Sequence, residues 1–193
     1  MKDLIHKALV AGVELRQKYI GVLDDDLLKA AEIMVESLRN GGKILVCGNG
    51  GSASDAQHFV AELVNRFEMN RPALAAIAMV NDASVITSIS NDFSFDAIYA
   101  RQTEALGRKG DILLGISTSG NSKNVLNAVE KAAEIGMQVV ALTGREGGKL
   151  GQHQGTTVHL NINHPSTARV QEMHITCLHI LCTLIDETMF WGK

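Results

Sequence analysis

The sequence predicts an α/β protein in which helices flank a five-stranded parallel sheet. Hydrophobic residues make up 46% of the 193 residues and aromatic residues only 4%, so the apolar content is mostly aliphatic. The 18 Gly and 2 Pro exclude collagen-like and disordered classes, and they disfavour the many turns of a β-sandwich. From residue 43 onward, short aliphatic runs alternate with helical patterns, which is typical of βαβ units.

Two amphipathic helices are predicted before this alternating region. Apolar residues recur at helical spacing over 4–15 and again over 27–38, and Gly41-Gly42 ends the second pattern. No linker divides the chain, so we expect one domain over 1–193. We expect the N-terminal extension 1–40 to bury its apolar stripes against a partner subunit.

The alternating region predicts five buried strands and five helices. The predicted strands are 43–47, 74–79, 111–116, 138–142 and 156–162. The predicted helices are 52–67, 83–90, 94–106, 122–135 and a long final helix at 166–188. Ligands of such folds bind at the carboxyl ends of the strands, where the strand order reverses. The loops that follow the strands are therefore the places to search for chemistry.

Charge and cysteine content limit the partners and the compartment. Lys and Arg total 18 against 21 Asp and Glu, a net charge of −3, which disfavours a nucleic-acid partner. The longest apolar run, 73–80, is too short to span a bilayer, and no signal-peptide pattern opens the chain. Cys47, Cys177 and Cys182 are scattered and suggest no disulfide framework. We expect a soluble cytoplasmic protein with no membrane partner.

Two loops after predicted strands have features that suit a ligand. The glycines of the loop 48–52 let the backbone approach a ligand closely, and Ser52 can cap the next helix. A tight turn explains that loop equally well. The loop 117–122 (STSGNS) places four hydroxyls and a glycine at a strand-to-helix junction, more than one helix cap needs. It indicates phosphate binding, and its lack of lysine favours a sugar monophosphate over a nucleoside triphosphate.

Four polar residues on two predicted helices could hold a metal ion. His58 and Glu62 lie four residues apart, so they share one helix face, although an exposed ion pair explains them equally. Gln171 and His179 lie on a mostly apolar helix, where a satisfied core glutamine and histidine is the plain alternative. These residue types can bind zinc. Gln171 and His179 are about 12 Å apart along the helix axis, so long side chains or two subunits must converge.

Four stretches together resemble one family. They are VCGNGGSASDAQHFVAEL, NDFSFD, LLGISTSGNSKNV and ARVQEMHITCLHIL. The chain resembles the sedoheptulose 7-phosphate isomerases, or phosphoheptose isomerases, which belong to the wider sugar-isomerase (SIS) domain group. STSGN alone marks the group, whereas GNGGS followed by HxxxE, with RxQE and a later His, is more specific. The resemblance covers nearly the whole chain. It implies a single SIS domain in a homotetramer whose sites lie at subunit contacts.

The resemblance also implies roles for individual residues. Glu62 and His179 match the catalytic pair of the family, and His58, Glu62, Gln171 and His179 match the ligands of one zinc ion per subunit. The matching substrate contacts are Asn49, Gly50, Gly51, Glu62, Asn91, Asp92, Ser117, Thr118, Ser119, Ser122 and Gln171. The implied reaction converts sedoheptulose 7-phosphate to D-glycero-D-manno-heptose 7-phosphate through an enediolate. It is the first step toward ADP-heptose for lipopolysaccharide cores. Asn-Asp pairs such as Asn91-Asp92 are also common helix caps.

Two other functions remain open at this stage. The chain is similar to the DnaA initiator-associating protein, a binding protein of the same fold, in NRFEMNRPALAAIA and LIDETMF. That branch lacks the acidic residue at the position of Glu62 and the histidine at the position of His179, which favours the enzyme here. The third function is a regulatory SIS module that senses phosphosugars. It is disfavoured because we expect no attached DNA-binding segment.

Overall fold

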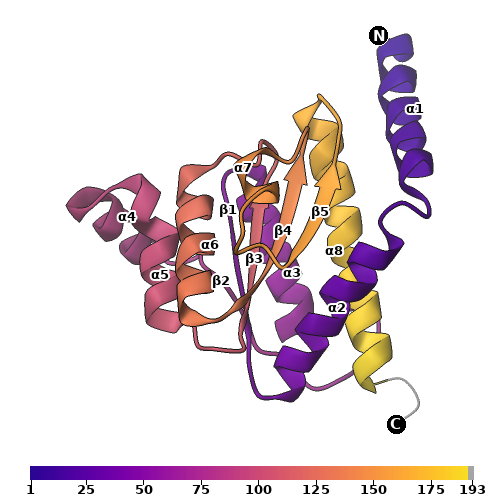
Figure 1. The fold of residues 1–193 in the computed structure, drawn as a ribbon. Coiled ribbons are helices and arrows are strands. Elements are labelled where there is room, and N and C mark those ends of the chain that lie inside the picture. The colour runs from indigo at the N-terminus through magenta and orange to yellow at the C-terminus, as the bar shows by residue number, and fades with distance from the viewer. Residues whose placement is uncertain (191–193) are drawn as a thin grey trace.

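A five-stranded parallel sheet forms the centre of the molecule (Figure 1). The computed structural model describes residues 1–190. The strands are β1 (Ile44–Gly48), β2 (Ala76–Ala78), β3 (Ile112–Ser117), β4 (Gln138–Gly144) and β5 (Val158–Ile162). Their order is β2-β1-β3-β4-β5, and each neighbouring pair is parallel. The predicted α/β class is therefore confirmed.

Helices cover both faces of the sheet because both faces of its strands are apolar. The helices are α1 (Lys2–Tyr19), α2 (Asp24–Arg39), α3 (Gly51–Val64), α4 (Ala83–Asp92), α5 (Ile98–Leu106), α6 (Lys123–Ile135), α7 (Gly148–Gly151) and α8 (Thr167–Phe190), with a 3₁₀ turn η1 (Phe95–Ala97). Ile44 and Val46 join a core with α2, α3 and α8. Leu45 and Cys47 point the other way, toward α5, α6 and α7.

The boundaries of several elements differ from those predicted. The predicted helix 52–67 ends at Val64, and the predicted strand 74–79 narrows to Ala76–Ala78 because β2 is an edge strand that pairs with β1 alone. The predicted helix 94–106 divides into η1 and α5. Ser52 does not cap α3. Gly50 is the cap residue, with φ 57°, and Ser52 lies buried inside the first turn.

Two helices are only partly covered by the rest of the chain. Helix α1 extends away from the sheet (Figure 1) and buries only Gly12, Leu15 and Tyr19. Helix α4 buries none of its residues. Within residues 1–190, the large apolar side chains with more than half of their surface exposed lie on α1, at its two ends or just after α4, namely Met1, Leu4, Ile5, Leu9, Val13, Ile20, Val22, Phe93 and Phe95. Exposed apolar groups of this extent mark surfaces that bind another protein.

The three thiols lie inside the protein. Cys47, Cys177 and Cys182 are free and buried, and burial raises the pKa of each to about 12. Within residues 1–190, none of the helices has the length and apolar character needed to cross a bilayer.

One histidine of α8 is part of the core. His174 is fully buried, and its Nε2 donates a hydrogen bond to the backbone carbonyl of Thr143 at 2.9 Å. Its Nδ1 is buried without a hydrogen-bond partner. Burial lowers the pKa of His174 to about 4, against the weaker opposing effect of the bond to Thr143. The folded protein therefore holds this imidazole neutral.

We expect His174 to make the protein less stable in mild acid. The unfolded chain binds a proton at this residue below about pH 6.5, whereas the folded chain resists until about pH 4. The free energy of unfolding should therefore fall by about 3 kcal/mol as the pH falls through this window. Urea unfolding from pH 7 to 4 measures the effect. His174→Gln, which can still donate to Thr143, should remove this part of the slope, and an unchanged slope would contradict the assignment.

Candidate active site

The loops after β1 and β3 meet where the strand order reverses. The chain passes from β1 to the edge strand β2 and then to β3 on the other side of β1, so the reversal lies between β1 and β3. The side-chain amides of Asn49 and Asn124 hold the two loops together by reciprocal hydrogen bonds of 2.8 and 2.9 Å. The hydroxyl of Tyr99 donates to the carbonyl of Gly48. These amide bonds occupy both polar atoms of Asn49, which leaves its backbone for a ligand.

Three of the four predicted hydroxyls form a cluster before α6. Ser117 Oγ lies 2.9 Å from Ser122 Oγ and 3.4 Å from Ser119 Oγ. Ser122 is the cap residue of α6, yet its side chain makes no capping bond. The hydroxyls are therefore not explained by helix capping. A cluster of donors at the positive end of a helix suits a phosphate. Thr118, half-buried, lies in the same loop.

The catalytic pair implied by the resemblance comes together between α3 and α8. The Nε2 atom of His58 lies 3.2 Å from Oε1 of Glu62 and 2.9 Å from Nε2 of His179. The ring of Phe67, which follows α3, stacks on His179 with 5.5 Å between ring centroids. The side chain of Glu62 is 24% exposed. Two imidazoles and a carboxylate thus share one partly open place, with groups that can move protons.

Gln171 lies two helical turns away from this cluster. A Cβ atom built on Gly51 would lie 2.2 Å from Nε2 of Gln171, so the glutamine amide packs directly on that glycine. The absence of a side chain at Gly51 therefore lets α8 approach the first turn of α3 closely. No hydrogen bond within residues 1–190 joins Gln171 to His58, Glu62 or His179.

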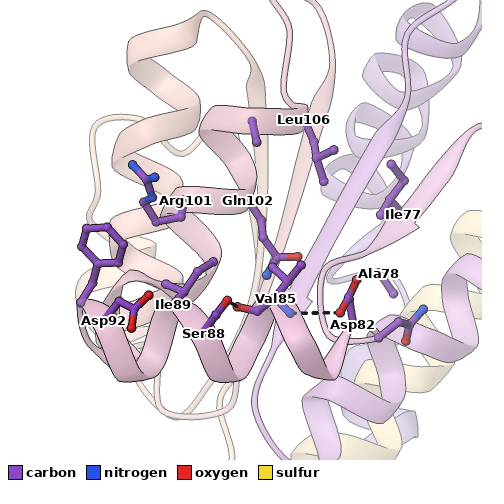
Figure 2. Close-up of a pocket in the computed structure, with 13 residues that line it drawn as sticks. Ile77, Ala78, Asp82, Val85, Ser88, Ile89, Asp92, Arg101, Gln102 and Leu106 are labelled. Carbon is purple, nitrogen blue, oxygen red and sulfur yellow. Dashed lines mark hydrogen bonds between the residues drawn. The ribbon is translucent and has the colours of Figure 1, made fainter.

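Asn91 and Asp92 lie in the last turn of α4, and Asp92 lines a different cavity. Asn91 Nδ2 donates to Asp92 Oδ1 at 2.9 Å, and both residues are exposed. Figure 2 shows Asp92 at a cavity of about 640 Å³ between β2, α4 and α5. Asp82 caps α4 by accepting a hydrogen bond from the backbone N–H of Val85 (Figure 2). Within residues 1–190, no hydrogen bond or ion pair links Asp92 to His179 or Glu62.

A buried arginine holds α3 against α8. Arg71 donates from Nε to Oδ1 of Asp186 at 2.6 Å, and both side chains are almost completely buried. Its guanidinium also donates to the carbonyls of Leu63 and Glu62, each at 2.8 Å, and to that of Pro72 at 3.1 Å. Arg71 thereby satisfies carbonyls that the last turn of a helix leaves without partners. It also fixes the position of the Glu62 backbone relative to α8.

The donor set suits zinc, but the side chains are not arranged around an ion. Imidazole nitrogens and a carboxylate oxygen are zinc ligands, and two nitrogens on one tetrahedral zinc lie about 3.4 Å apart. His58 and His179 approach to 2.9 Å, a hydrogen-bonding distance, so small side-chain rotations must precede binding. In the part of the chain that is described, no three His, Cys, Asp or Glu residues form a ready metal centre.

The comparisons with known proteins agree with this fold. Residues 12–144 match the SIS domain family. The phosphoheptose isomerase of Neisseria gonorrhoeae strain NCCP11945 is 51% identical over 193 residues, covering 100% of this chain and 98% of that protein. The phosphoheptose isomerase of Helicobacter pylori strain P12 is 49% identical over 95% of each. The structure of the enzyme GmhA from N. gonorrhoeae superposes with a TM-score of 0.91 at 46% identity, covering 96% and 98%.

The sheet order, the hydroxyl loop before α6 and the matched family together define a SIS-domain protein. Within that class, the identity of about 50% to phosphoheptose isomerases over the full chain determines the family. The chain belongs to the phosphoheptose isomerase family.

Several residues of the site were not found from the sequence. Arg71, Asp186 and Asn124 are buried polar groups, and Phe67 was placed inside a helix that ends earlier. Asp186 is a charged residue inside an apolar run, and that pattern could have indicated a buried ion pair. Its partner could not be read from the sequence because the two are 115 residues apart.

The ion pair between Arg71 and Asp186 should show strong coupling between its two members. Arg71→Leu or Asp186→Leu alone leaves a buried charge without its partner, which costs about 3–5 kcal/mol of stability. The double variant replaces both charges with apolar groups and should lose less than either single variant. Urea unfolding of the three variants gives the coupling energy. Simply additive losses would show that the two residues do not act as a pair.

Proposed function

We propose that this chain interconverts sedoheptulose 7-phosphate and D-glycero-D-manno-heptose 7-phosphate, with Glu62 and His179 as its catalytic groups. The observation that carries this assignment is the meeting of His58, Glu62 and His179 at 2.9–3.2 Å in a member of the phosphoheptose isomerase family. The product supplies heptose for lipopolysaccharide precursors.

The reaction moves one proton between C1 and C2 and another between their oxygens. A carboxylate such as that of Glu62 can remove the carbon-bound proton, which produces an enediolate. His179 can carry a proton to and from the oxygen, and its stacking on Phe67 restrains its ring. Returning the proton to the neighbouring carbon completes the isomerisation, so no external oxidant is needed.

The hydroxyl cluster before α6 is proposed to hold the phosphate. Ser117, Ser119 and Ser122 would donate to its oxygens together with backbone N–H groups at the start of α6. Binding energy from the distant phosphate then orients the reacting end of the sugar. The side chain of Lys123 pairs with Asp96 at 2.8 Å, so its charge is engaged outside the cluster.

We further propose one zinc ion per subunit, held by His58, Glu62, Gln171 and His179. When bound, zinc would polarise the carbonyl and stabilise developing negative charge on oxygen. Gln171 must turn away from Gly51 to take part, which its flexible side chain permits. A carboxylate bound to zinc is a weaker base, so Glu62 cannot serve fully as both ligand and base. The zinc content and activity of its variant, described below, distinguish the two roles.

A homotetramer is proposed from the uncovered helices. The exposed apolar side chains on α1 and after α4 need a partner, and copies of the same chain supply one without another protein. The part of the extension 1–40 that would then lie in the subunit interface is α1, whereas α2 buries its apolar stripe in the core of its own chain. Buried, unpaired thiols fit the reducing cytoplasm, where we place the enzyme.

Glu62→Gln and His179→Gln should each reduce kcat by at least about 10²-fold, because each removes a proton-transferring group. Purified protein is incubated with sedoheptulose 7-phosphate, with and without chelator and added zinc, and aldoheptose phosphate is measured. Zinc content is determined for each variant. Loss of activity with zinc retained assigns a proton-transfer role, whereas loss of both assigns a ligand role.

Glu68→Gln, an exposed carboxylate outside the cluster, serves as the control and should keep full activity. Full activity in both Glu62→Gln and His179→Gln would refute the catalytic assignment. A wild-type protein that is inactive even with zinc would instead favour a binding protein of the same fold.

Ser119→Ala should weaken substrate binding without slowing the chemical step. One hydrogen bond to a charged group contributes about 1.5–3 kcal/mol, so KM should rise about 10–100-fold at nearly constant kcat. Thr188→Ala, an exposed hydroxyl near the end of α8, is the matched control. An unchanged KM would remove Ser119 from the phosphate site.

A further inference from the structure

Asp55 has a buried carboxylate oxygen without a hydrogen-bond partner. Its Oδ2 is inaccessible to solvent, and within residues 1–190 no protein group donates to it. Burial raises the pKa of this carboxyl to about 6, while the nearby His58 opposes that increase. A buried acceptor without a donor costs free energy and is uncommon, so its presence beside His58 needs an explanation.

The position of Asp55 on α3 places it within the candidate site. Positions 51, 55, 58 and 62 follow one another at spacings of four, three and four, so they form a single stripe along the helix. The positions on either side of Asp55 in this stripe face α8, because Gly51 contacts Gln171 and His58 contacts His179. Asp55 therefore lies one turn before His58, on the side of α3 that faces α8.

His58 has one ring nitrogen left for such an acceptor. Its Nε2 faces Glu62 and His179, and no hydrogen bond to its Nδ1 is made by residues 1–190. Side chains of a helix lean toward its N-terminus, so the imidazole leans over the preceding turn. That turn carries Asp55, whose Cβ is a neighbour at i, i+3 spacing, about 5–6 Å away.

We propose that Asp55 is a positioning residue that accepts a hydrogen bond from the Nδ1–H group of His58. This inference rests on the proposed zinc site. Histidines that bind metals commonly donate their second N–H group to a carboxylate, which fixes the tautomer and the ring orientation. Here the bond keeps the lone pair of Nε2 directed toward Glu62 and His179. Once the two side chains rotate toward each other, the bond also gives the buried oxygen of Asp55 the donor that it lacks in this structure.

The amide of Gln171 is the competing donor for Asp55. Its Nε2 packs on Gly51, one turn before Asp55 on the same stripe. If Asp55 bound Gln171 instead, the tautomer of His58 would be independent of residue 55. The two pairings therefore predict different states of the histidine ring.

Zinc affinity and the tautomer of His58 test the proposal together. Zinc binding is measured by competition with a chelator for wild type, Asp55→Asn, Asp55→Glu and Asp25→Asn, where Asp25 is an exposed carboxylate on α2. Asp55→Asn should lose about 10–100-fold in affinity, the usual effect of removing such a carboxylate. Asp55→Glu keeps the charge but displaces the oxygens, so it should also bind less tightly. Asp25→Asn should match the wild type.

The metal-free variants should unfold at or above the wild-type temperature if Asp55 serves the site rather than the fold. Asp55→Asn replaces a buried charged group with a neutral one, and the hydration regained offsets the loss of the bond to His58, so a purely functional role leaves stability intact or improved. A large drop in Tm would identify a structural role and overturn the proposal. Full zinc affinity in Asp55→Glu together with loss in Asp55→Asn would do the same, since charge alone would then suffice.

Nitrogen NMR of the histidine rings gives an answer that does not depend on zinc. His58 of the metal-free wild type should carry its proton mainly on Nδ1, and Asp55→Asn should shift the population toward Nε2–H. An identical tautomer in both proteins excludes the bond. If the wild-type protein binds no zinc, the proposed zinc site is refuted. The tautomer of His58 alone then decides whether Asp55 positions the histidine. If Asp55→Asn does not fold, an unprotonated Nδ1 in the wild type rejects the proposal.

Discussion

The guanidinium of Arg71 lies between α3 and α8 and donates four hydrogen bonds there, one to Asp186 and three to backbone carbonyls. Two of those carbonyls belong to the last turn of α3, including that of Glu62. The distance between Glu62 and His179 therefore depends on a buried charge some residues away from both. An ion pair in this place contributes more to the alignment of the helices than to net stability, since buried charges lose much hydration.

Patterns in the sequence were sufficient for the architecture and for the local parts of the site. Aliphatic runs marked all five strands, and the spacing of His58 and Glu62 placed both on one helix face, as the 3.2 Å contact confirms. The hydroxyls of 117–122 were also recognised. Pairings between distant segments were not accessible. Periodicity fixes which face a residue occupies, but the position of α8 beside α3 arises from packing of the whole sheet.

The site combines two differently built parts. The part proposed to bind phosphate lies at the reversal of strand order, where the amide pair Asn49–Asn124 joins the loop after β1 to the first turn of α6. The part proposed to transfer protons lies on two helices, α3 and α8, and consists of side chains rather than backbone groups. The sequence did not reveal the structural role of Asn49. Its side-chain amide bonds to Asn124 and so holds the loop after β1 in place.

Burial of the three thiols provides a natural probe of protein opening. Cys47, Cys177 and Cys182 lie in β1 and α8, and each has a pKa of about 12, so almost no thiolate exists at neutral pH. A thiol reagent reacts with the thiolate and needs access to the sulfur, so labelling proceeds only through opened states. The labelling rate at Cys47 thus reports on the centre of the sheet, and those at Cys177 and Cys182 on the release of α8.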